Sequence, residues 1–104
     1  MSVVHVVAVI TAKPGKRGDV LAAFHENIPN VLAEDGCIAY GPTVDTDGVG
    51  AIQTAFGDDT FVVIEQWQSL DHLKAHAAAP HMAAYAAKVK DLLLDRVIHV
   101  LSPT

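Results

Sequence analysis

The sequence predicts an α+β fold in which helices cover one face of an antiparallel sheet. Segments rich in Val and Ile, which are typical of strands, alternate with segments whose apolar residues recur at helical spacing. The length of 104 residues suits a single domain spanning residues 1–104. The candidate strands are apolar on both faces, which indicates that the sheet face without helices is covered as well.

The first half of the chain contains two predicted strands and one predicted helix. Residues 3–12 (VVHVVAVITA) are apolar at alternating positions on both faces, as in a strand buried on both sides. Residues 18–34 place apolar side chains at gaps of one, three and four, which predicts a helix with a kink caused by Pro29. Residues 37–44 (CIAYGPTV) are the second predicted strand.

The second half of the chain repeats this pattern after a long connection. Residues 45–59 are rich in Gly and Asp, and residues 60–68 (TFVVIEQWQ) are a strong strand candidate. Ser69 can cap the helix that follows, and Pro80 begins a new or kinked helical segment. Residues 97–101 are the last predicted strand. The order β-α-β-β-α-β is the ferredoxin-like arrangement.

The composition predicts that this chain buries part of its surface against another chain. Hydrophobic residues make up 51% of the sequence and charged residues 18%, whereas ordinary domains carry about 25% charged residues. A homodimer is the simplest way to bury such an apolar surface. The second sheet would then cover the bare face of the first.

Charge and cysteine content argue against several classes of partner and location. The net charge is −5 and the seven Lys and Arg residues are scattered, so nucleic acid and anionic membranes are not expected partners. The apolar N-terminal segment is too short to span a bilayer and lacks the basic start of a signal peptide. A single cysteine, Cys37, indicates a reducing compartment, so we expect a cytoplasmic protein.

Short motifs distributed along the whole chain carry a family resemblance. They are Lys13-Pro14-Gly15, Glu34-Asp35-Gly36-Cys37-Ile38, Glu65-Gln66-Trp67, and His76 with Pro80-His81. In their order and spacing they resemble the antibiotic biosynthesis monooxygenase (ABM) domains, in particular the quinol monooxygenase type. The resemblance implies a dimeric α+β barrel and a monooxygenase that oxidises a small hydroxylated aromatic with O₂ and needs no cofactor.

The histidines of the second helical segment allow either a metal site or a proton-transfer site. His72 and His76 have the i, i+4 spacing of zinc ligands, with His81, Asp71 or Glu65 as a third ligand. Because His72 points away from the face of the helix that is predicted to be buried, we expect a solvated His72 and no bound metal.

Three residues of this segment are candidate catalytic residues: His81, His76 and Tyr85. An imidazole has an unperturbed pKa of about 6.5, which suits proton transfer at neutral pH. Either histidine can instead be a core residue bonded to a backbone carbonyl, and the sequence does not decide which of them is the base. Tyr85 lies four residues after His81 and can orient its imidazole, bond a substrate oxygen, or serve as a core aromatic.

The candidate substrate-binding residues are expected to line a pocket between the sheet and the second helical segment. They are Trp67, Phe61, Glu65, His5 and Phe24. Trp67 offers a flat wall and an N–H donor, while Glu65 either reaches the pocket or forms a structural pair. In this interpretation a histidine removes a phenolic proton and the resulting anion reduces O₂. The alternative function is a dimeric ligand-binding or regulatory protein without catalysis.

Overall fold

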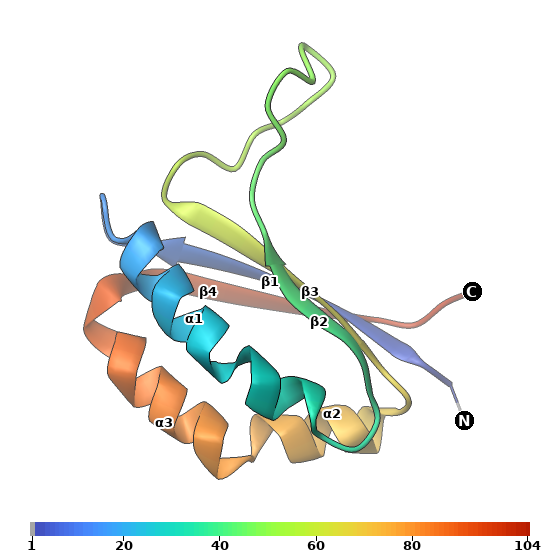
Figure 1. Ribbon diagram of the computed structural model, residues 1–104. Coiled ribbons are helices and arrows are strands. Elements are labelled where there is room, and N and C mark those ends of the chain that lie inside the picture. Colours follow the sequence, from blue (N-terminus) through green and yellow to red (C-terminus); the bar gives the residue numbers. More distant parts are fainter. Residues whose placement is uncertain (1) are drawn as a thin grey trace.

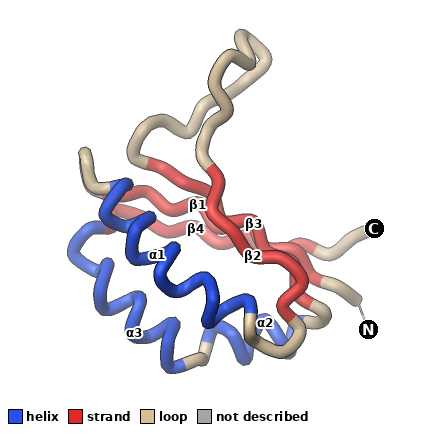
Figure 2. The backbone as a smooth tube through the Cα atoms, viewed as in Figure 1, coloured by secondary structure: helices blue, strands red, loops and turns tan. Residues whose placement is uncertain are grey.

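The computed structural model describes residues 2–104, so only residue 1 of the predicted domain lies outside the described part. The strands form one four-stranded antiparallel sheet, and the helices lie on one face of it (Figures 1 and 2). In chain order the elements are β1 (Val4–Ala12), α1 (Arg17–Leu32), β2 (Cys37–Thr43), β3 (Thr60–Trp67), α2 (Leu70–Ala77), α3 (Pro80–Val89), a 3₁₀ turn η1 (Lys90–Leu92) and β4 (Leu93–Leu101). The predicted ferredoxin-like order is confirmed, with the second helical segment divided into α2 and α3. Among residues 2–104, every helix is too short or too polar to cross a bilayer.

The sheet has the strand order β2-β3-β1-β4, so the first and third strands of the chain lie at its centre. β4 pairs with β1 along its length, ending with Ala12 opposite Leu93. The last strand therefore begins at Leu93 and not at residue 97 as the sequence suggested. The reason is that pairing with a central strand outweighs the helical spacing of the apolar residues just before it.

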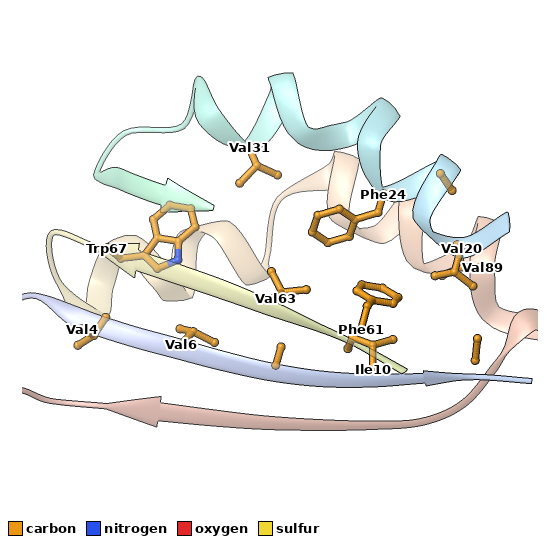
Figure 3. Packing of buried hydrophobic residues seen from close by; sticks show 13 residues of the cluster. Val4, Val6, Ile10, Val20, Phe24, Val31, Phe61, Val63, Trp67 and Val89 are labelled. Atoms are coloured by element: carbon orange, nitrogen blue, oxygen red, sulfur yellow. The ribbon is translucent and has the colours of Figure 1, made fainter. Parts of the chain in front are cut away.

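The hydrophobic core lies between the sheet and the helices (Figure 3). Every second residue of β1 from Val4 to Ala12 is buried on that side, as the period of a strand requires. On β3, Phe61 and Trp67 are the largest fully buried side chains. Phe24 is buried from the opposite side, on the apolar face of α1. The helices are therefore held to the sheet by apolar burial along one shared face.

The sheet face without helices is also apolar, as the sequence predicted. Val7 and Ile64 are opposite each other on the central strands and both point to this face. Ile64 is 46% exposed, and Val97 and Leu101 of β4 are 41% and 50% exposed. No helix formed by residues 2–104 covers these side chains.

Two local signals in the sequence act as predicted. The hydroxyl of Ser69 accepts the backbone N–H of His72 at 3.2 Å and caps α2. Pro80 is the first residue of α3, and Ala79 before it is extended with φ −66° and ψ 138°, because a residue that precedes proline avoids the helical region. The chain therefore turns between α2 and α3 instead of continuing as one helix.

The long connection between β2 and β3 projects from the sheet (Figure 1). Its two ends are joined by Asp45, whose carboxylate accepts the backbone N–H groups of Phe56 at 3.0 Å and Gly57 at 2.9 Å. These hydrogen bonds lower the pKa of Asp45. The connection thus has a defined base.

Gly36 allows the chain leaving α1 to pass directly against α2. Its φ of +81° lies in the left-handed region that favours glycine, and a Cβ at this position would overlap the imidazole ring of His72. Its carbonyl accepts the N–H of Gln68 at 2.8 Å. This close approach carries the neighbouring Glu34 to the helices that follow β3.

Gly36→Ala should destabilise the protein more than the matched variant Gly48→Ala. Both positions have a positive φ, +81° and +76°, which costs an alanine about 1–2 kcal/mol. Gly48 has open space around it, whereas Gly36 would also push against His72, adding about 1–3 kcal/mol. Urea unfolding of both variants measures the difference, and equal losses would contradict a tight contact between Gly36 and His72.

Candidate active site

A single carboxylate, that of Glu34, joins two of the predicted catalytic histidines. Its Oε2 lies 3.0 Å from Nδ1 of His76, and its Oε1 lies 2.6 Å from Nε2 of His81. His76 is in the last turn of α2 and His81 in the first turn of α3, so the turn between these helices is what lets both rings meet one side chain. Glu34 itself follows α1 and its side chain is 17% exposed. The structure therefore brings together three segments around one carboxylate.

His76 is the buried member of the pair, with 5% of its surface exposed. Glu34 contacts Nδ1 through both carboxylate oxygens, at 3.0 and 3.1 Å, so this nitrogen carries the hydrogen. The other nitrogen, Nε2, then has a free lone pair, and no residue between 2 and 104 hydrogen-bonds to it. The ring packs against Trp67, with centroids 4.7 Å apart, and against Tyr40 at 5.4 Å.

His81 is held at both of its nitrogens. The amide Nδ2 of Asn27 lies 3.2 Å from Nδ1 and donates to it, which leaves the hydrogen on Nε2 near Glu34. This second contact is close, at 2.6 Å, but the buried Nε2 is not aligned for a hydrogen bond, so the contact is electrostatic. Because both nitrogens face a neighbour, His81 is less free than His76 to take a proton from a ligand.

A second carboxyl group, that of Glu65, lies on the sheet side of the same site. It is 7% exposed, and its Oε1 accepts the indole N–H of Trp67 at 2.9 Å. It is directly opposite Tyr40 on β2. Burial raises the pKa of Glu65, against the lowering effects of the Trp67 N–H and the nearby His76. Burial also raises the pKa of Tyr40, which keeps its phenol neutral.

Aromatic rings fill the space beside these polar groups. Phe24 stacks on Tyr40 at 5.2 Å between centroids and meets Phe61 edge-on at 5.7 Å and Tyr85 edge-on at 5.8 Å. Figure 3 shows Phe24, Phe61 and Trp67 in the layer between sheet and helices. Tyr85 lies against Phe24, while the nitrogens of His81 pair with other residues. Burial raises the pKa of Tyr85 to about 12.

Two other predicted residues lie outside this group. His5 is on the helix-free face, between Gln66 of β3 and Leu101 of β4. His72 is partly buried, with its side chain 26% exposed and its Nδ1 2.7 Å from the hydroxyl of Ser69. It is therefore not the solvated residue that the sequence suggested, because the close packing at Gly36 holds it in place.

His72 and His76, the pair with i, i+4 spacing, each contact a different carboxylate. Nε2 of His72 lies 3.3 Å from Asp35, whereas His76 contacts Glu34. Within the described residues 2–104, no group of three or more His, Cys, Asp or Glu side chains has a geometry that could hold a metal ion.

Two hollows on the surface of residues 2–104 both lie away from the space between the sheet and His76. One, of about 380 Å³, lies at the base of the β2–β3 connection beside Phe56 and Ile64. The other, of about 290 Å³, lies on the outer side of α2 and touches the site only through Glu34. Where the sequence suggested a pocket, the rings of Trp67 and His76 are in contact. A flat ligand would therefore have to separate these rings.

Sequence reasoning did not give Glu34 or Tyr40 a functional role. Glu34 belongs to a motif that carries the family resemblance, but it is 42 residues away from His76 along the chain. No helical or strand spacing connects residues that far apart. Only the folded chain reveals that the two histidines share this carboxylate.

Comparisons with known proteins identify the family and the fold of the chain. The sequence pattern of the family described as "Antibiotic biosynthesis monooxygenase" matches residues 3–88. The chain is 42% identical to "Probable quinol monooxygenase YgiN" of Escherichia coli, over 94% of this chain and 95% of that protein. The solved structure of Rv0793 from Mycobacterium tuberculosis has a TM-score of 0.80 at 30% identity, covering 99% of this chain and 96% of that one. PA3566 from Pseudomonas aeruginosa has a TM-score of 0.83, covering 100% and 96%, and at 23% identity it supports the fold alone.

Replacing Glu34 by Ala should destabilise the protein by about 1–3 kcal/mol, because the buried Nδ1 of His76 loses its acceptor. The matched variant Glu26→Ala removes an exposed ion pair to Lys88 of 2.6 Å, which is worth about 0–1 kcal/mol. Chemical denaturation of the two variants at neutral pH measures both losses. A loss for Glu34→Ala no larger than that for Glu26→Ala would contradict a structural role for the shared carboxylate.

Proposed function

The chain belongs to the antibiotic biosynthesis monooxygenase family, and on that premise we propose that it oxidises a small hydroxylated aromatic, such as a quinol, with O₂. One observation carries the proposal. His76 is held by Glu34 through Nδ1, so that a free basic nitrogen lies within a group of buried aromatic side chains. The name of the E. coli relative, a quinol monooxygenase, supports the substrate class.

In the proposed reaction Nε2 of His76 removes a phenolic proton from the substrate. Glu34 accepts the Nδ1–H and stabilises the imidazolium that forms, as a carboxylate does for a general base. His81 contacts the same carboxylate electrostatically through Nε2 and helps to keep it in place. The resulting phenolate is electron-rich enough to reduce O₂.

The oxidation balances without an added reductant or cofactor. One oxygen atom of O₂ enters a ring carbon, and the other leaves as water. The four electrons that O₂ takes up all come from the substrate, as the quinol becomes a hydroxyquinone. The protein has to supply a base, a proton donor and a dry aromatic surface.

We place the substrate ring against Trp67, with Phe24 and Phe61 extending the aromatic wall. The site reaches the surface at Glu34 and Tyr40, which are both only partly buried, so access is expected on that side. Tyr85, beyond Phe24, closes the far end. His5, on the other face of the sheet, has no part in this site.

His76→Ala should lower kcat/KM for O₂ uptake by about 10²–10⁴-fold, the usual contribution of a general base. His25→Ala, at an exposed position of α1, is the matched control and should leave uptake unchanged. Uptake is followed with an oxygen electrode across a panel of quinols and naphthols.

The absence of protein-dependent uptake across the panel would contradict the proposed function. Saturable binding without turnover would instead support a ligand-binding protein. Retained activity in the double variant His76→Ala, His81→Ala would leave the function standing but reject the proposed base.

We further propose that the chain forms a homodimer through the helix-free face of the sheet. This face carries exposed apolar side chains on both central and edge strands, including Ile64 and Leu101. Burying them in a second, identical face removes them from water, and the low proportion of charged residues favours such an arrangement. Two sheets packed in this way would form an α+β barrel.

Ile64→Lys should convert the protein from a dimer to a monomer, because it would place a charge in the centre of the proposed interface. Leu32→Lys, at a position of α1 that is 54% exposed, is the matched control and should stay dimeric. Light scattering coupled to gel filtration gives the mass of each. A monomeric unmodified protein, or a dimeric Ile64→Lys variant, would rule out this interface.

A further inference from the structure

The site contains two carboxyl groups in contrasting environments. Glu34 lies towards the surface and contacts two imidazoles. Glu65 lies on a central strand and is 7% exposed. No Lys or Arg of residues 2–104 forms an ion pair with it. In this described part of the chain, the one hydrogen bond to its carboxyl group comes from the indole N–H of Trp67, at 2.9 Å.

The groups around Glu65 stabilise its ionised form only weakly. Across the strands lie Val6 of β1 and Tyr40 of β2, neither of which is a cation. His76 of α2 favours the ionised form, whereas Glu34 beside it opposes that form. Cys37, on β2, is near enough for Glu65 to raise the pKa of its thiol.

Desolvation is the dominant influence on Glu65, so the folded chain favours its protonated form relative to an exposed glutamate. A carboxyl group whose burial favours its protonated form, next to a separate base, is a usual arrangement of an acid and a base in one site. Glu34, paired with the histidines, belongs to the base. Glu65 is then left with the opposite role.

We propose that Glu65 is the proton donor of this site and protonates the reduced oxygen that forms when the substrate anion reacts with O₂. This role rests on the proposed function and extends it from the removal of a proton to its return. It differs from the substrate-binding role that the sequence suggested for Glu65. The buried position between Tyr40 and Trp67, next to the base His76, is what supports it.

The proposed steps conserve protons and electrons. His76 takes the phenolic proton, and the anion gives two electrons to O₂ as a carbon–oxygen bond forms. Glu65 gives its proton to the outer oxygen of this peroxide. The O–O bond then breaks as the ring carbon releases its hydrogen as a proton, which returns to Glu65, while the C–H electron pair forms the new carbonyl group. The outer oxygen leaves as hydroxide and takes the proton of His76 to become water.

The variant Glu65→Gln tests the donor role, since an amide keeps the volume and can still accept the Trp67 N–H but has no acidic proton. The exposed Glu26→Gln is the matched control. We expect the variant to bind and deprotonate substrate without O₂, seen as a change in the substrate spectrum. In air, product should form about 100-fold more slowly, and a larger share of the O₂ consumed should appear as H₂O₂.

Protonation can be measured independently of activity, because the chain has only three glutamates: Glu26, Glu34 and Glu65. In protein labelled with ¹³C at glutamate, the carboxyl signal of Glu65 should titrate at a higher pH than that of a solvent-exposed glutamate, because burial raises its pKa. The signal missing from Glu65→Gln assigns it. If that variant does not fold, Glu26→Gln and Glu34→Gln assign the remaining signal by elimination.

The outcomes separate this inference from the function on which it rests. If the unmodified protein oxidises substrate and Glu65→Gln yields as much product per O₂ at the same rate, the donor role is wrong and the function stands. A Glu65 signal that titrates with or below that of Glu26 also overturns it. If the unmodified protein consumes no O₂ with any substrate, the proposed function is wrong, and the donor role that rests on it is wrong as well.

Discussion

The arrangement of the helix layer depends on the contacts of the Glu34 carboxylate with His76 and His81. A carboxylate that is mostly buried needs polar partners, and here they are the N–H of His76 in the last turn of α2 and the imidazole of His81 in the first turn of α3. The break between these helices at Pro80 is what allows one carboxylate to meet both rings. The same contacts join the segment after α1 to the helices that follow β3. The close packing of Gly36 against α2 and the position of the site therefore depend on each other.

The sheet contributes the second half of the site through its alternation. Phe61, Glu65 and Trp67 are separated by even numbers of residues, so they point to the same face of β3. The strand that builds the core therefore also places a carboxyl group and an indole in it. Burying a carboxyl group there is unfavourable unless it is protonated or hydrogen-bonded. The Trp67 N–H meets part of this requirement. A polar group retained in such a place, next to a histidine with a free nitrogen, is a reason to assign chemistry to the site.

The two faces of the sheet have different roles in the proposed function. One face is closed by helices and contains the site, while the other presents apolar side chains. The same two-faced strands therefore account both for a well-packed core and for the expectation of a partner. The β2–β3 connection, held at its base by Asp45, extends from the sheet without contributing to the Glu34 group.

The sequence by itself determined the elements, their order and several of their ends, because helical and strand periods, a serine cap and a proline are local signals. It also indicated His76, His81, Glu65 and Trp67 as candidates, through residue type, spacing and the family resemblance. Tertiary structure decided the rest: β4 starts at Leu93 because β1 pairs with it, and His72 is packed beneath Gly36. It alone brought Glu34 to two histidines more than 40 residues away and gave each histidine a different hydrogen-bonding role. Contacts of that kind depend on how distant segments pack in space, which no local period in a sequence encodes.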